Sequence, residues 1–229
     1  MQRLMAFPAW CAPLLAGVAA AQQPTAPAAQ QHVRGDVVAF RGDTLEVQPR
    51  SGDVLKLKVA TGAKVSLVGK ADLSSVGEGA FIGTTAVPQS DGTLRAVEVH
   101  VFPDSMRGTG EGHRPWDLQP GSTMTNATVA KVDEGGAAAQ AGGTGSTMTN
   151  ATVAKVDESG GARKLTLHYK DGEKTVVVPP GTPVVKLEPG ERSNLVPGTH
   201  VFAIVSRQPD GTLLADRLNV GKDGLVPPM

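Results

Sequence analysis

Cysteine is nearly missing from this chain of 229 residues, which has only Cys11. Cys11 lies in an N-terminal segment that we expect to be removed. The mature protein would then have no disulfide bond, no thiolate metal site and no cysteine nucleophile. Its stability would have to come from core packing.

Aromatic residues and net charge are also scarce. Aromatic side chains make up 3% of the sequence, and 22 basic residues balance 22 acidic ones. Proteins that bind single strands stack bases on aromatic side chains, and binding to phosphate backbones or anionic lipids needs clustered positive charge. The composition therefore argues against a nucleic-acid partner.

Long apolar runs are absent apart from one N-terminal stretch. Residues 1–21 combine a basic Arg3, a short apolar segment at Met5–Val18 and three alanines ending at Ala21. This pattern predicts a secretory signal peptide, cleavage after Ala21 and a periplasmic location. A membrane anchor is the alternative, but the segment contains two prolines and is shorter than the roughly 20 apolar residues of a spanning helix. We therefore predict no membrane span.

Short alternating runs, broken by Gly, Asp and Pro, follow a linker at residues 22–30. Such runs are typical of strands joined by tight turns, and Asp91-Gly92 favours the positive φ of a hairpin turn. The candidate strands of the first half read VRGDVVAF, TLEVQP, VLKLKV, AKVSLV, AFIGTTAV and LRAVEVHVF. No convincing amphipathic helix occurs, and residues 71–76 could form at most one helical turn.

The same pattern recurs at an offset of 119 residues. DGTLRAVEVHV at 91–101 matches DGTLLADRLNV at 210–220, and residues 62–82 align without gaps on 181–201. The repeat predicts an all-β protein of two tandem small OB-like β-barrels joined by a Gly/Pro-rich linker. The expected ranges are 31–103 for the first barrel, 104–149 for the linker, 150–221 for the second barrel and 222–229 for a tail.

A second, shorter repeat lies inside the linker. GSTMTNATVAKVDE occurs at 121–134 and again at 145–158. Pairing with the later strand KLTLHY needs a loop of about five residues from the second copy but about 30 from the first, a difference of about 1.5 kcal/mol in closure entropy. We therefore predict that the second copy pairs and that the first is redundant. Two identical ligand sites are a less favoured reading of the duplication.

The segment between the modules concentrates polar groups around one tryptophan. The candidate ligand-binding residues are Arg107, His113, Arg114, Trp116 and Asp117. Guanidinium groups beside an aromatic ring could bind an anionic or sugar-like ligand. The alternative is structural: Trp116 would fill a barrel end or the seam between the barrels, while Arg114 pairs with Asp117.

Signals for metal binding and catalysis are weak. The histidines and methionines lack ligand spacing, no Gly-x-Ser-x-Gly motif occurs, and the glycines of 108–112 do not form a phosphate loop. We predict no metal, no cofactor and no enzyme activity, but an exported binding or scaffold protein. Its partner would be an unknown small molecule, a cell-envelope component or a protein. The alternative is a periplasmic metal-handling protein or an enzyme with its site at the linker.

The linker motif also carries a resemblance to a known family. RGTGEGHRPWD followed by GSTMTNATV, at 107–129, resembles a family of exported bacterial proteins that are built from small OB-like barrels and have no assigned function. The resemblance implies the fold and the compartment but no activity or site. Some members carry a label as permease components of metal transporters, which the absence of a predicted span contradicts here. The second copy of the linker repeat departs from the family pattern.

Overall fold

The computed structural model describes residues 30–134 and 161–229. These residues form an all-β protein with no helix of seven or more residues. The strands are β1 (Gln30–Arg41), β2 (Thr44–Pro49), β3 (Leu55–Lys70), β4 (Phe81–Pro88), β5 (Leu94–Val101), β6 (Gly112–Pro115), β7 (Thr123–Glu134), β8 (Arg163–Tyr169), β9 (Gly172–Val178), β10 (Val184–Pro189), β11 (His200–Arg207) and β12 (Leu213–Gly221). The short 3-10 helices are η1 (Leu73–Ser75), η2 (Asp104–Met106) and η3 (Arg192–Asn194).

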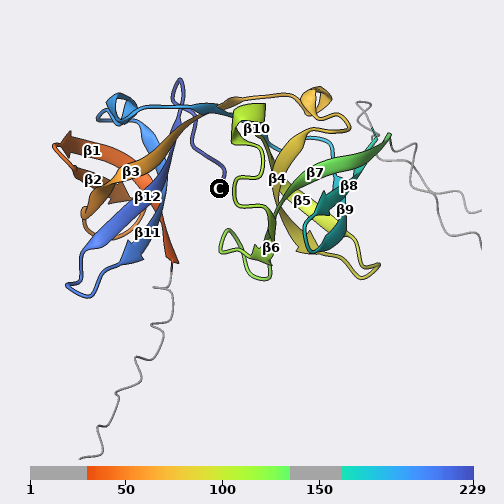
Figure 1. Cartoon of the computed structure of the whole chain (residues 1–229), viewed down its shortest axis with the longest axis horizontal. Coiled ribbons are helices and arrows are strands. Elements are labelled where there is room, and N and C mark those ends of the chain that lie inside the picture. Colours follow the sequence, from red (N-terminus) through yellow and green to blue (C-terminus); the bar gives the residue numbers. More distant parts are fainter. Residues whose placement is uncertain (1–29, 135–160) are drawn as a thin grey trace, which may run out of the picture.

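Five strands close the first barrel, on the left in Figure 1. β1 pairs with β2 and β11, β2 pairs with β3, and β12 joins β11 to β3 through a parallel pairing that closes the ring. Alternate side chains on these strands point inward, as the period of two dictates. They bury an aliphatic core that includes Leu45, Leu57 and Leu218, each fully buried.

The second barrel, on the right in Figure 1, consists of β5, β4, β7, β8 and β9. Its ring closes through a short parallel pairing of β5 with β9, in which Leu94 and Arg95 lie opposite Val176 and Val177. Its core contains Ile82, Leu165 and other fully buried aliphatic side chains. β6 lies beside this ring and pairs with β7.

This pairing does not confirm the tandem barrels predicted from the sequence. The first barrel combines β1, β2 and β3 of the first module with β11 and β12 of the second. The second barrel takes β4 and β5 from the first module, β7 from the predicted linker, and β8 and β9 from the second module. The ranges 31–103 and 150–221 therefore mark sequence repeats, and neither of them closes a barrel from its own strands.

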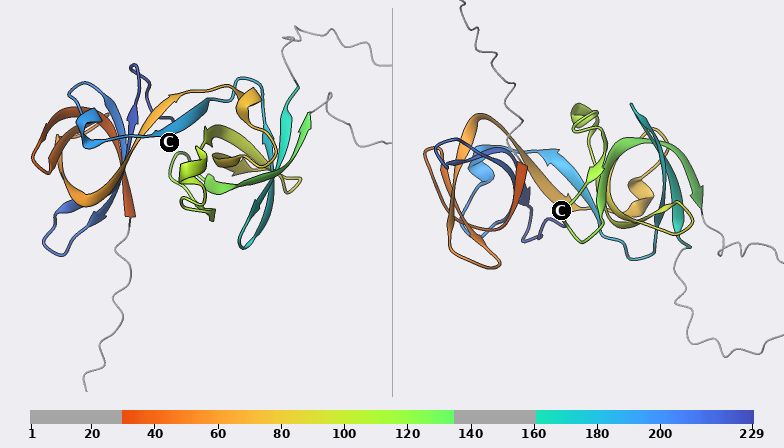
Figure 2. Two further views of the ribbon diagram at one scale, coloured as in Figure 1. Left: turned by 45° about the horizontal axis from the view of Figure 1, so that its top comes forward. Right: turned by 90° about the horizontal axis from the view of Figure 1, so that it is seen from below.

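The exchange depends on β3, which runs as one strand of 16 residues. The sequence suggested two strands there, VLKLKV and AKVSLV, but Gly62 between them does not adopt the positive φ of a glycine turn. The far end of β3, Ser66–Lys70, pairs antiparallel with Val185–Pro189 of β10. Figure 2 shows these two strands passing side by side from one barrel to the other.

The pairing of the duplicated segment also differs from the prediction. β7 belongs to the first copy, and Thr128–Glu134 pairs with β8. The predicted partner, the second copy at 145–158, lies outside the described residues. The prediction compared only the lengths of the loops that lead to β8. The first copy also gains a strand pairing, because β6 forms a short hairpin with the beginning of β7. The sequence before the second copy, GGAAAQAGGT, has the composition of a flexible linker.

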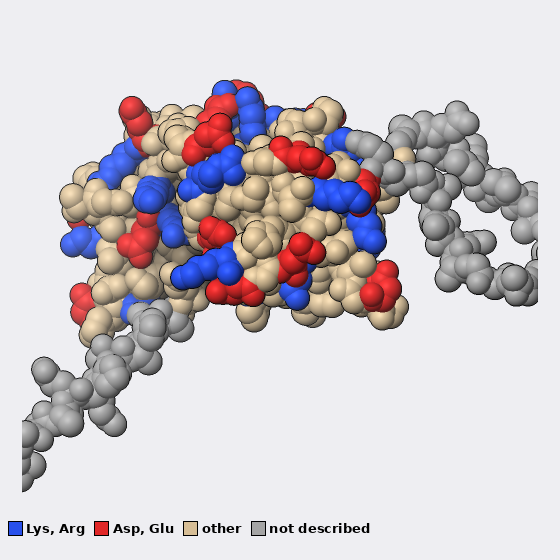
Figure 3. All heavy atoms as spheres, turned by 45° about the vertical axis from the view of Figure 1, so that its right-hand side comes forward, with Lys and Arg blue, Asp and Glu red and all other residues tan. Residues whose placement is uncertain are grey.

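The two barrels share a third apolar cluster. Val68, Val185, Leu187 and Phe202 are buried there. On the face shown in Figure 3, Lys and Arg side chains are mixed with Asp and Glu. In the part of the chain that is described, no helix has the length and apolar character needed to cross a membrane.

Candidate functional site

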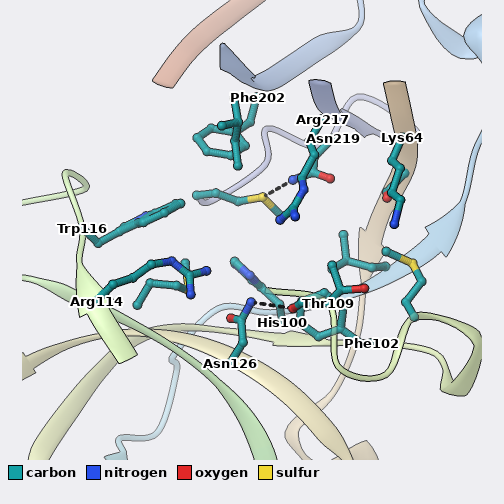
Figure 4. A pocket seen from close by; sticks show the side chains of 16 residues that line it. Lys64, His100, Phe102, Thr109, Arg114, Trp116, Asn126, Phe202, Arg217 and Asn219 are labelled. Carbon is teal, nitrogen blue, oxygen red and sulfur yellow. Dashed lines mark hydrogen bonds between the residues drawn. The ribbon is translucent and has the colours of Figure 1, made fainter. Parts of the chain in front are cut away.

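A cavity of about 70 Å³ lies between the barrels, beside the third apolar cluster. It is lined by Lys64, Ser66, His100, Phe102, Met106, Thr109, Arg114, Trp116, Met124, Asn126, Leu187, Phe202, Ile204, Arg217, Asn219 and Met229. Figure 4 shows side chains from both barrels and from the segment between β5 and β7 converging on it. The exchange of strands creates this site, because it holds β5 of one barrel opposite β11 and β12 of the other.

The charged side chains of the lining all have the same sign. Lys64, Arg114 and Arg217 line the cavity, and none of its sixteen described lining residues is Asp or Glu. The nearest buried carboxylate is Glu98, behind His100, with Oε1 3.1 Å from His100 Nε2 and accepting a hydrogen bond of 2.6 Å from Thr85 Oγ1. The cavity is therefore a region of positive charge on a molecule with no net charge.

Three nitrogen donors converge beside Gly110. A Cβ atom at Gly110 would lie 3.2 Å from Nδ2 of Asn126, 3.3 Å from Nη2 of Arg114 and 3.4 Å from Nη1 of Arg217. Gly110 has a φ of +58°, which an L side chain rarely adopts. Glycine thus serves two purposes here, since it permits the turn and lets the three nitrogens approach the backbone closely. We call these four residues the donor cradle.

The backbone holds two of the cradle side chains in place. Arg114 Nη1 donates a hydrogen bond of 2.7 Å to the carbonyl of Gly110, and Asn126 Nδ2 donates one of 3.0 Å to the carbonyl of Thr109. An amide NH₂ has a second proton, and a guanidinium has five. Both groups therefore keep protons for a further acceptor.

The cradle guanidinium groups repel each other. Burial lowers the pKa of Arg114, and the charge of Arg217 lowers it further. An anion between them would relieve both effects, because it would replace lost hydration and screen like charges. No carboxylate among the described residues forms an ion pair with either side chain.

A second groove, of about 210 Å³, also adjoins the cradle. Its lining includes Gln30, Gly110, Arg114, Asp216 and Arg217. Consecutive residues of a regular strand point to opposite faces, but the β11–β12 register shifts between the pairs that flank Asp216. This bulge allows Asp216 and Arg217 to line the same groove.

Trp116 forms a wall between the cavity and the groove. Its ring centroid lies 4.3 Å from that of His32 and 6.0 Å from that of Phe202, both on strands of the first barrel. Arg114 stands over the indole, with Cζ 5.9 Å from the ring centroid. Within the described residues, the buried indole Nε1 has no hydrogen-bond partner. A tryptophan in the seam would normally satisfy this donor, so the arrangement leaves one more donor unused.

Of the five predicted site residues, Arg114 and Trp116 line the cavity and three lie elsewhere. Arg107 donates hydrogen bonds to Asp104 and to the carbonyl of Gly79. His113 is hydrogen-bonded to Thr125 Oγ1 at 2.8 Å on the far side of β6. The period of two along β6 explains this separation, since His113 and Arg114 are adjacent and point to opposite faces.

Asp117 faces the first barrel. It accepts hydrogen bonds of 2.7 Å from Arg34 Nη2 and from His32 Nδ1. The predicted structural alternative, a pair between Arg114 and Asp117, is replaced by this contact with Arg34. Burial raises the pKa of Asp117, but the hydrogen bonds from Arg34 and His32 outweigh it and hold the pKa at about 2. Asp117 therefore ties the linker to β1.

Sequence reasoning missed three members of the cradle: Gly110, Asn126 and Arg217. A signal for Arg217 was present in the repeat, because Arg217 aligns with Glu98 at the offset of 119. Likewise Asn219 aligns with His100, and both line the cavity. Differences between otherwise matching repeats thus coincide with this site.

Among the described residues, no group of three or more His, Cys, Asp or Glu side chains could hold a metal ion. No protein-family model matches the chain, and no curated protein or solved structure matches it either. A function is therefore inferred from the chemistry of the cavity alone.

Proposed function

We propose that the protein is an exported, non-catalytic binding protein that holds a small anion between two OB-like barrels. The gathering of side-chain nitrogens from Asn126, Arg114 and Arg217 around Gly110, at the edge of the cavity, is the observation that carries this proposal. Hydrogen bonds from charged donors to an anionic oxygen are roughly twice as strong as neutral ones. Two guanidinium groups and an amide give such an oxygen three partners.

Charge and accessibility support an anion over a neutral ligand. Arg114 is half-buried, and the side chains of the lining supply three cations and no carboxylate. Coulombic attraction grows as water is excluded, so the partly buried cations of this cavity favour an anion more than the mixed charges of the outer surface do. The indole Nε1 of Trp116 is a further donor at the same wall.

The OB-like assignment and the export belong to the proposal. Each barrel has a three-stranded meander closed by two further strands, and a parallel pair closes each ring. This arrangement is typical of the five-stranded OB barrel, whose surfaces bind diverse ligands. The N-terminal sequence pattern at 1–21 supports a signal peptide and a periplasmic location.

Calorimetric titration of the purified protein in low-chloride buffer tests the proposal. Acetate, butyrate, phosphate and sulfate are the anionic probes, and 1-butanol is the neutral control. We expect saturable binding of at least one anion and none of 1-butanol. Gly110→Ala should weaken binding about tenfold or more, since its methyl group would press against the three donor nitrogens and shift them away from the positions that an anion needs.

Gly108→Ala is the matched control. Gly108 also has a positive φ, +79°, but nothing lies within 4 Å of the position of a Cβ. Both substitutions therefore strain the same loop, and only Gly110→Ala fills the cradle. Equal anion affinity in the two variants, or the failure of every anion to bind the parent, would refute the proposed function.

A further inference from the structure

The geometry points to a specific class of anion, a monocarboxylate with a short apolar tail. This inference rests on the proposed function and extends it. The cradle would hold the carboxylate where the cavity meets the outer groove, since Arg114 and Arg217 line both spaces. The tail would extend into the cavity.

The inner cavity suits an uncharged, apolar group. Eight of its lining side chains are apolar: Phe102, Met106, Trp116, Met124, Leu187, Phe202, Ile204 and Met229. Apolar surface that enters such a space leaves water and gains contacts with the wall. A ligand that is only a small, fully hydrated anion would leave this surface unused.

Two carboxylates bracket the site and oppose a second negative charge on the ligand. Glu98 is 1% exposed and lies behind His100 at the inner end. Asp216 lines the groove at the outer end. Like charges close together are costly where water is excluded. A second charge would therefore be repelled at either end, and Lys64, the lining cation outside the cradle, is solvent-exposed and would offset little of this repulsion.

The size of the cavity limits the tail. Its volume is about 70 Å³, and an apolar cavity of roughly 150 Å³ holds a benzene molecule. About half of that space accommodates a tail of about three carbon atoms, so butyrate should come closest to filling it.

A homologous series measures the tail directly. The parent protein is titrated by calorimetry with acetate, propionate, butyrate, pentanoate and hexanoate, and with succinate as a dianion of the same length as butyrate. We expect the affinity to rise about fourfold for each added methylene up to butyrate or pentanoate. Beyond that length the affinity should level off or fall. Succinate should bind about fivefold more weakly than butyrate because of its second charge.

Met106→Ala tests where the tail lies. Met106 lines the cavity from η2 and is only partly buried, so its truncation enlarges the space without removing a core side chain. The chain length at which the affinity stops rising should then increase. Circular dichroism confirms that the variant is folded. An unchanged chain length would place the tail elsewhere and overturn the inference.

The outcomes separate this inference from the proposed function. If acetate, phosphate and hexanoate bind equally well and Gly110→Ala abolishes all three, the anion site stands and the apolar tail is refuted. If succinate binds more tightly than butyrate, the preference for one charge is refuted. If no carboxylate binds but phosphate or sulfate does, the anion site stands and this inference is refuted, whereas the failure of every anion refutes both proposals.

Discussion

Asp117 shows how single side chains fasten the linker to the first barrel. Its carboxylate receives hydrogen bonds from Arg34 and His32 on β1, and these hold its pKa at about 2 against an ordinary 3.8. A carboxylate whose pKa is lowered in the folded state stabilises that state above its unfolded pKa. The contribution is lost as the pH falls from about 4 through 2.

Asp117→Asn should therefore reduce stability at pH 7 and have little effect in acid. The side chain is 51% exposed, so solvent screening limits the loss at pH 7 to about 0.5–1 kcal/mol. Urea unfolding of both proteins between pH 7 and pH 2 measures the difference. A difference that persists unchanged at pH 2 would show that the ionic contacts of Asp117 contribute nothing.

Sequence reasoning reached some of these residues and missed others for physical reasons. Arg114 and Trp116 were accessible because cations beside an aromatic ring stand out in a segment of low complexity. In the sequence, Gly110 is one of several nearby glycines and nothing distinguishes it. Its lack of a side chain matters only because Arg217 packs close to it, and Arg217 lies 107 residues away in sequence and on another barrel. Side chains that meet only after strand exchange leave no local pattern.

At the scale of elements, the first copy of the duplicated segment fills a defined place. β7 pairs with β4, β6 and β8, and Val129 on this strand is 1% exposed in the second core. The second copy has an identical sequence, so intrinsic strand tendency cannot distinguish the two. What distinguishes them is β6, which lies directly before the first copy.

Matched substitutions in the two copies test this assignment. Val129→Ala should lower the free energy of unfolding by about 2 kcal/mol, through lost burial and the resulting cavity. Val153→Ala, the same change at the equivalent position of the second copy, should cost less than about 0.5 kcal/mol. Thermal and urea unfolding give both values. Equal costs would mean that the copies share the place of β7, and a larger cost for Val153→Ala would reverse the assignment.

The strands themselves were largely predictable, whereas their partners were not. Alternation and turn residues located most strands, including β4 and β5. The hairpins β4–β5 and β11–β12 are copies of one another. Either hairpin could therefore pair with the three-stranded meander of either barrel. Local pattern is therefore compatible with tandem and exchanged barrels alike. The choice depends on the continuous β3 and its pairing with β10 across the gap.

On the scale of the whole molecule, the exchange ties both halves of the chain into each barrel. β10 connects the two barrels by pairing with both β3 and β5, and the apolar cluster between them includes Val68, Leu187 and Phe202. A site between such barrels is held more rigidly than one between domains joined only by a linker. This rigidity suits a cradle whose three donors must stay within hydrogen-bonding reach of one anion.

The indole N–H of Trp116 reports on that site most directly. A ¹H–¹⁵N spectrum of the purified protein is recorded during titration with butyrate, and Trp116→Phe identifies the resonance, since Trp10 is the only other tryptophan. We expect the Trp116 signal to shift and saturate at the affinity found by calorimetry, and the shift to disappear in Gly110→Ala but persist in Gly108→Ala. A Trp116 signal that stays fixed while butyrate and every other anion are added would contradict an anion site between the barrels.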